Sequence, residues 1–167
     1  MACILYPFYV ALSLIVNVAC LFLNPFAAAF ADDAGNLPSW LKWFQTFDND
    51  LDAGQRAGNT NFNWRYLNRV FWLYRNSAYG FDYYPFGKIF NPEKWRVVKF
   101  IDTPEKTLFF AVGDTGFNYY YIGPWGSYKF GWKAWNCYTN GAWSKTPFGP
   151  EWRVPLAFSP NPCARKQ

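Results

Sequence analysis

The chain begins with a long apolar run. Between residues 4 and 23, only Pro7, Ser13 and Asn17 interrupt a series of aliphatic, aromatic and small side chains. At a rise of about 1.5 Å per residue, a helix over this run matches the roughly 30 Å hydrocarbon core of a bilayer. Pro7 falls in the first turns, where a missing N–H does little harm, and Asn24-Pro25 is expected to end the helix. The pattern therefore predicts a membrane-spanning helix.

The first 31 residues carry no charge, and all charged residues follow them. Ala29-Phe30-Ala31 also has the small-x-small pattern that precedes the cleavage point of a secretory signal. However, no Lys or Arg precedes the apolar run, and the run is longer than the apolar core of a usual signal, about 7–15 residues. We therefore predict a membrane anchor over residues 1–31. A cleaved signal peptide is the main alternative, and a core helix of a soluble protein is a further one.

Polar and small side chains form one stripe along the predicted helix. Ser13, Asn17, Cys20 and Asn24 follow one another at spacings of four, three and four residues, which places them on one face. Such a polar stripe prefers a protein partner to lipid, and interhelical hydrogen bonds contribute about 0.6–2 kcal/mol each. We therefore predict a homo-oligomer that associates through the stripe, with Asn17 contributing most. Alternatively, a lone span tolerates Ser and Cys, and Asn24 marks the interface.

Residues 36–47 form an amphipathic segment directly after the anchor. Trp40 and Trp43 flank Lys42, a combination that suits the headgroup layer of a membrane, where indole rings are favoured. We predict a short helix with these three residues as an interfacial anchor, and packing of the helix on the domain's own core is the equal alternative. Its apolar positions are Leu37, Trp40, Leu41, Phe44 and Phe47.

Residues 63–75 have the pattern of a basic amphipathic helix. Arg65, Arg69 and Arg75 lie largely off its apolar stripe. These arginines suit lipid phosphates, nucleic acid or an acidic protein surface, although a charged face in contact with water is the commoner explanation. The stripe itself consists of Trp64, Leu67, Phe71 and Tyr74.

From residue 95 onward, turn signals separate short runs of aromatic and β-branched residues. Asn140-Gly141 is the strongest hairpin signal among them. A small antiparallel β-meander accounts for all of these runs, so the predicted fold class is α+β. We expect the helical and loop region of residues 32–90 to form one domain with the β region of residues 91–167. The predicted strands are Trp95–Ile101, Thr107–Val112, Phe117–Ile122, Ser127–Trp135 and Trp152–Phe158.

The fourth predicted strand carries candidate binding residues. Its cations Lys129 and Lys133 stand beside Trp132 and Trp135, rings on which nucleic-acid bases could stack. Buried sheet aromatics beside solvated lysines explain the same strand without any ligand. We therefore name these four residues as candidates for binding a partner, and we expect no nucleic-acid binding.

Aromatic residues make up 24% of the chain, more than a core of this size needs. Large rings are favoured at membrane surfaces and protein interfaces, so the excess favours binding over catalysis. The chain has no His, the usual general base and the commonest metal ligand. Asp48, Asp50 and Asp52 match the start of a calcium loop, but Ala53 and Asn59 replace its essential Gly and Glu. We predict no enzyme, no cofactor and no metal site.

The cations nearest the predicted span are Lys42 and Arg56, which follow it, and none precedes it. The positive-inside rule therefore places the C-terminal domain in the cytoplasm. Cys137 and Cys163 would then be free thiols, whereas in a periplasmic domain they would be candidates for a disulfide.

Three stretches resemble small uncharacterised membrane proteins encoded by tailed phages and prophages. They are residues 37–46 (LPSWLKWFQT), residues 72–81 (WLYRNSAYGF) and residues 130–133 (FGWK). The resemblance implies a viral origin and location in the bacterial inner membrane, and it brings no catalytic residues.

We therefore expect a phage-encoded, membrane-anchored protein that binds a host envelope protein or a viral protein. Superinfection exclusion or interference with the host would suit such a protein. One alternative is a structural role, in which copies assemble into a membrane or virion component. Another is nucleic-acid binding at the membrane.

Overall fold

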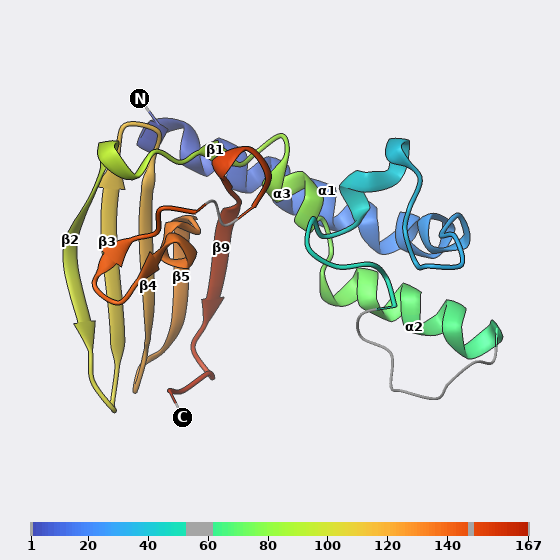
Figure 1. Cartoon of the computed structure of the whole chain (residues 1–167). Helices are drawn as coiled ribbons and strands as arrows, with labels where there is room; N and C mark the ends of the chain where they lie inside the picture. The colour runs from blue at the N-terminus through green and yellow to red at the C-terminus, as the bar shows by residue number, and fades with distance from the viewer. Residues whose placement is uncertain (1, 53–61, 147–148, 167) are drawn as a thin grey trace. The chain divides into compact units, whose positions relative to one another are not determined.

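The computed structural model describes residues 2–52, 62–146 and 149–166 (Figure 1). It contains a long N-terminal helix, short helices and antiparallel strands, which confirms the predicted α+β class. The chain divides into two compact units, residues 1–10 with 86–167 and residues 11–85. We call them the β unit and the helical unit and describe each by itself.

The α-helices occupy the first half of the chain. α1 spans Ala2–Ala29, and its residues from 11 onward belong to the helical unit. α2 spans Phe62–Arg75, where the sequence pattern predicts a basic amphipathic helix, and α3 is a short helix over Tyr79–Tyr83.

The predicted end of the first helix at Asn24-Pro25 is wrong, because α1 continues for another turn. Pro25 has no N–H, so the carbonyl of Leu21 lacks its usual helical donor. The hydroxyl of Tyr74 in α2 donates to this carbonyl at 3.0 Å, and the hydroxyl of Tyr66 donates to the Pro25 carbonyl at 2.9 Å. These bonds compensate for the missing backbone bond, so the helix passes through the proline.

The amphipathic segment at residues 36–47 is shorter than predicted. Only Ser39–Phe44 is helical, and it forms a 3₁₀ helix, η1. The Gln45 side chain accepts a hydrogen bond from the Leu37 N–H at 2.8 Å, and the backbone of Gln45 is extended. Gln45 thereby ties the two ends of the segment together and stops the helix.

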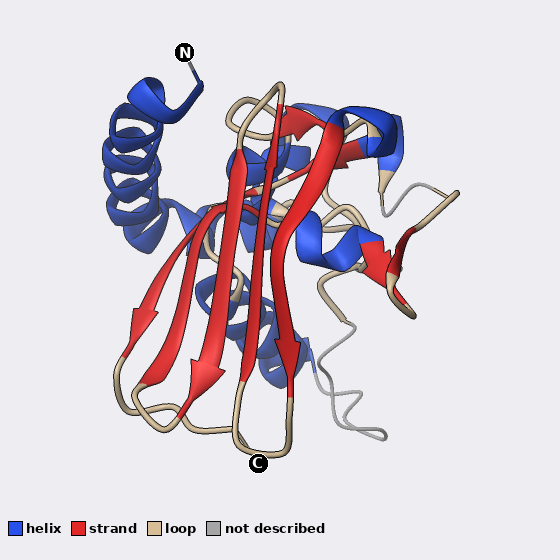
Figure 2. Ribbon diagram, turned by 90° about the vertical axis from the view of Figure 1, so that its left-hand side faces the viewer, coloured by secondary structure: helices blue, strands red, loops and turns tan. Residues whose placement is uncertain are grey.

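A five-stranded antiparallel sheet forms the centre of the β unit (Figure 2). Its strands lie side by side in chain order, as a meander does. The first three begin where predicted and extend one residue further, the fourth ends three residues early, and the last begins after a short separate strand. The sheet consists of β2 (Trp95–Asp102), β3 (Thr107–Gly113), β4 (Phe117–Gly123), β5 (Gly126–Trp132) and β9 (Leu156–Asn161).

Two small strand pairs complete the β unit. Asn140-Gly141 forms the predicted hairpin turn, with φ of 51° and 80°, as a tight two-residue turn requires. The pairs are β6 (Tyr138–Thr139) with β7 (Ala142–Trp143), and β1 (Lys88–Ile89) with β8 (Arg153–Val154). Short 3₁₀ helices lie at Pro92–Lys94, Ala134–Cys137 and Pro150–Trp152.

Trp132 is a central residue of the β-unit core and is fully buried. Its indole N–H donates to the Phe86 carbonyl at 2.9 Å, and the rings of Tyr6 and Phe117 meet it edge-on. The Tyr6 hydroxyl donates to the Ala157 carbonyl at 2.7 Å. The first turns of α1 are therefore part of this core.

The core of the helical unit lies where the last turns of α1 pack on α2. Ala27 and Ala28 are small enough to let α2 approach closely, and they lie against Val70 and Leu73. Burial of a side chain such as Leu73 stabilises the fold by about 1.5–3 kcal/mol. Leu37 and Leu51 close this core from the intervening segment.

Gly131→Ala is expected to destabilise the β unit strongly. Gly131 has φ of +89°, and an added Cβ would lie 2.1 Å from the Phe117 carbonyl oxygen in β4. Gly141→Ala is the matched control, since its φ is +80° and nothing lies within 4 Å of the added Cβ. We expect the control to lose about 1–2 kcal/mol from its backbone conformation and Gly131→Ala about 1–3 kcal/mol more, measured by chemical unfolding in mild detergent. Equal losses would contradict the close approach of β4 and β5.

Candidate functional site

The polar stripe of α1 faces partners within the helical unit. The Ser13 hydroxyl donates to the carboxylate of Asp82 at 2.6 Å, and the Asn17 amide donates to the Ser13 carbonyl at 2.9 Å. Cys20 and Asn24 are each 1% exposed. The structure places the four predicted residues on one face, where Ser13 has a partner on α3, Asn17 bonds only to Ser13 of its own helix, and the buried Asn24 side-chain nitrogen makes no hydrogen bond to the described residues. Association of two copies through this face stays a prediction.

The opposite side of α1 is apolar and exposed. In the helical unit, Ile15, Val18, Phe22 and Phe26 are 65%, 58%, 72% and 71% exposed and recur every three or four residues. We call these four residues the apolar face of α1. Within the described residues, Ile4–Ala29 is the one helical segment long and apolar enough to cross a membrane, and 17% of its most apolar stretch is buried. A core helix of a soluble protein would be mostly buried, so the exposure argues against that alternative.

The stripe of apolar residues on α2 is also exposed, although such stripes usually face a core. Trp64 and Phe71 are 57% and 64% exposed, and Leu67 and Tyr74 are 41% and 37% exposed. Because Tyr74 bonds to Leu21, which is itself 51% exposed, this stripe adjoins the exposed side of α1. The two helices thus present neighbouring apolar surfaces.

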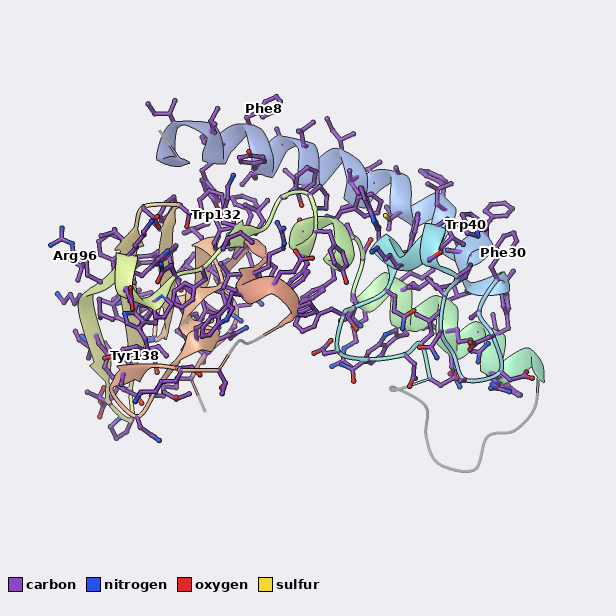
Figure 3. All side chains as sticks on the ribbon, turned by 45° about the horizontal axis from the view of Figure 1, so that its top comes forward. Phe8, Phe30, Trp40, Arg96, Trp132 and Tyr138 are labelled. Atoms are coloured by element: carbon purple, nitrogen blue, oxygen red, sulfur yellow. The ribbon has the colours of Figure 1, made fainter. Side chains whose placement is uncertain are left out.

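An aromatic pair lies at the C-terminal end of α1. Trp40 and Phe30 are 66% and 57% exposed, and their rings meet edge-on at 5.2 Å (Figure 3). Trp43 packs on a ring of α3, and the Lys42 ammonium lies 4.9 Å from the Tyr84 ring. All three predicted interfacial residues are exposed, and Trp40 is more exposed than Trp43, at 66% against 40%.

The arginines of α2 are paired within the helical unit. Arg69 makes two hydrogen bonds to Asp52, at 2.7 and 2.6 Å, and Arg65 reaches the same carboxylate at 3.3 Å. The hydrogen bond from Arg69 holds the pKa of the Asp52 carboxyl below its usual value. Arg75 stands apart, over the Trp72 ring at 5.8 Å. The three predicted arginines therefore do not act as one phosphate-binding face. Three residues of the sequence argument, Ala53, Arg56 and Asn59, lie outside the described residues.

The four candidate residues around β5 do not share a surface. Trp132 lies in the core, directly after Gly131, whose φ is positive. Trp135 stacks on the ring of Tyr120 at 5.1 Å, and the Lys129 ammonium lies over both rings. Lys133 falls beyond the strand, where its N–H donates to the Pro155 carbonyl at 2.9 Å.

The other face of the sheet carries a row of rings that no single strand pattern identified. Phe110, Tyr119, Phe130 and Phe158 stand opposite one another on β3, β4, β5 and β9, with neighbouring ring centres 5.7 to 6.4 Å apart. We call these four residues the aromatic row. Cross-strand aromatic pairs stabilise a sheet by about 0.2–1 kcal/mol each. None of the four is buried, and Phe158 is 46% exposed.

A shallow hollow of about 700 Å³ borders this row at the turn between β4 and β5. Trp125 stands at its rim and is 79% exposed, and the Tyr128 hydroxyl donates to the Trp125 carbonyl at 2.8 Å. Glu105 and Lys106 add one charge of each sign to the lining. Exposed rings beside mixed charges are typical of a protein-binding surface.

One protein-family model matches the chain over residues 1–167, and its description is a family of unknown function (DUF7338). The chain belongs to this family. No curated protein and no solved structure matches it. The function of the protein is therefore inferred from its exposed surfaces on α1, α2 and the sheet.

Asp52→Asn is expected to destabilise the helical unit by about 1.5–3 kcal/mol, because it weakens the charge-assisted bonds to Arg65 and Arg69. Asp114→Asn is the matched control, since the pair of Asp114 with Lys94, at 3.5 Å, is exposed. We expect the control to change the free energy of unfolding by less than about 1 kcal/mol. Urea unfolding at neutral pH measures both, and similar losses would contradict a structural role for the Asp52 cluster.

The same cluster predicts how stability depends on pH. The folded-state pKa of Asp52 lies below that of an unfolded Asp, about 3.9. Its contribution is therefore complete above that value and is lost as the pH falls through the lower, folded-state pKa. We expect the difference in unfolding free energy between the wild type and Asp52→Asn to shrink below about pH 4. A difference that stays constant with pH would rule out this linkage.

Proposed function

We propose that this member of the DUF7338 family is a membrane-anchored binding protein. Its helix α1 anchors it to the bacterial inner membrane, and the aromatic row of the β unit binds a protein partner on the cytoplasmic side. The apolar face of α1 carries the proposal, because it is exposed although the opposite side of the helix is covered by folded chain. Transfer of such a surface from water to hydrocarbon is favourable by about 25 cal/mol per Å².

The contacts of α1 support a permanent anchor over a cleaved signal. Cleavage after Ala31 would remove Tyr6 from the core of the β unit. It would also remove Ala27 and Ala28 from the core of the helical unit. A segment that supplies buried side chains to the fold is not one that the mature protein discards.

The distribution of charge supports the cytoplasmic side. The chain carries a net charge of +5, all of it after residue 31. Cations near a span are retained in the cytoplasm, and the anionic lipids of that leaflet attract basic segments by about 1 kcal/mol per cation near the surface.

The aromatic row supports a binding function. Tyr, Trp and Phe are enriched at protein interfaces, where a few large rings supply much of the binding free energy. Trp125 and the hollow beside it extend the row with exposed polar and charged groups. By the resemblance to phage proteins, the partner is a host envelope protein or another viral protein, and the role is superinfection exclusion or interference with the host.

A second candidate function is the binding of single-stranded nucleic acid. Lys99 stands opposite Phe110, and Arg96 stands opposite Val112, so both cations lie on the face of the sheet that carries the aromatic row. Stacking rings beside cations are the elements of single-strand binding surfaces.

The full chain is expected to stay in the membrane pellet after washes with high salt and with carbonate, because burial in hydrocarbon does not depend on charge. Phe22→Asp with Phe26→Asp should release a large part of the protein. Ile89→Asp, at an exposed apolar position of the β unit, is the control and should stay bound. Release of the wild-type protein by carbonate would disprove the anchor.

A photoreactive phenylalanine analogue at position 158 is expected to crosslink to one membrane-fraction protein, because Phe158 is an exposed end of the aromatic row. The analogue at position 89, which is 47% exposed and outside the row, is the control. Equal crosslinking at both positions would count against a specific surface.

Binding of single-stranded nucleic acid, the second candidate function, is tested by measuring the affinity for single-stranded DNA at several salt concentrations. If it is correct, the purified protein binds single-stranded DNA, the affinity falls steeply with salt, and Arg96→Ala with Lys99→Ala lowers the salt dependence. We expect no binding even at low salt, and binding with this dependence would replace the protein partner by nucleic acid.

A further inference from the structure

We infer that the helical unit lies on one membrane leaflet, with α1 and α2 in the plane of the membrane, and that α1 does not cross the bilayer. The surface that enters the lipid consists of the apolar face of α1 and the exposed stripe of α2. This inference rests on the proposed membrane anchoring and specifies its geometry.

Polar groups of the helical unit cover one side of α1 over most of the part that belongs to this unit, residues 11–29. Asp82 accepts a hydrogen bond from Ser13, and Cys20 contacts the backbone of Ala78. Further along, Tyr66 bonds to the carbonyl of Pro25. From Ser13 to Pro25 these contacts extend over about 18 Å of helix.

The polar groups that contact α1 would be costly to place in hydrocarbon. If Ile4–Ala29 crossed the bilayer, Ser13 would lie within about 5 Å of its centre and would carry Asp82 with it. A carboxylate there costs about 2.5–3.5 kcal/mol on insertion scales. The turns on either side of α3 would also enter the bilayer, where irregular backbone in contact with lipid is not tolerated.

α2 has the properties of a helix that lies at a membrane surface. Its 14 residues measure about 21 Å, too short for a hydrocarbon core of roughly 30 Å. Trp64 and Phe71 lie on its exposed apolar stripe, Arg65 and Arg69 lie off it, and Arg75 is the last residue of the helix. Helices with large apolar side chains on one side and arginines on the other lie at the boundary between headgroups and acyl chains.

The in-plane orientation accounts for all of these features together. The apolar face of α1 enters the acyl chains, while Asp82 and the Asp52 cluster stay on the side of the headgroups and water. Trp40, beside Phe30, continues the surface at the end of α1 with an indole, the side chain favoured at the membrane boundary (Figure 3). The covered side of α1 carries small and uncharged polar residues but no charge, because that side packs on protein and not on water.

Depth measurements with a fluorescent thiol probe test the orientation in the full-length protein. Cys3→Ser and Cys163→Ser provide the background, and Cys20 and Cys137, which are each 1% exposed, remain in place. Single cysteines are introduced as Ile15→Cys, Phe22→Cys or Phe71→Cys. Nitroxide-labelled phospholipids at two depths in vesicles of anionic and neutral lipid quench the probe and report its depth.

We expect quenching at all three positions and closely similar depths for the probes at 15 and 22. A crossing helix would separate these two probes by about 10 Å in depth, which would overturn the in-plane orientation while leaving the anchor intact. Absence of quenching at 15 and 22 would show that a second copy or water, and not lipid, covers the apolar face, and would overturn the anchor as well. Asn49→Cys, at an exposed position of the helical unit three residues before Asp52, is the control and should not be quenched.

Discussion

The rest of the structure depends on one constraint: α1 contains no charged residue and must be shielded from water on most of its surface. On one side, small residues admit α2, two tyrosine hydroxyls bond to carbonyls around Pro25, and Ser13 binds Asp82. On the other side, large apolar residues are exposed. Because the covered side carries the polar contacts, the exposed side is left to a purely apolar environment.

Elements that depend on near neighbours in the chain could be predicted from the sequence. The spacing of apolar residues in α2, the turn at Asn140-Gly141 and the first three strands are of this kind. The errors have their causes in distant or special contacts. α1 passes through Pro25 because Tyr66 and Tyr74 supply hydrogen bonds from 41 and 53 residues away. β5 ends three residues earlier than predicted, directly after a glycine with positive φ.

The candidate surfaces could also be predicted only where they depend on residues that are near one another in the chain. The polar stripe and the exposed indole of Trp40 follow from spacing and position, but the stripe has its partners within the chain, which helical spacing alone does not specify. From the sequence, three arginines on one helix suggest a phosphate-binding site, but in the structure two of them are paired with Asp52. The aromatic row depends on the register of four strands, so no single strand predicts it.

The bond between Tyr6 and Ala157 has a consequence for biosynthesis. The two residues are 151 positions apart, so α1 leaves the ribosome long before the strand that its first turns bind. At about 5–20 residues per second, the delay is on the order of 10 s. During that interval α1 is a hydrophobic nascent segment without its partner strand, open to recognition by the cell's targeting factors. If α1 is the membrane anchor proposed above, it reaches the membrane before the sheet is complete, and β9 then closes onto a helix that is already there.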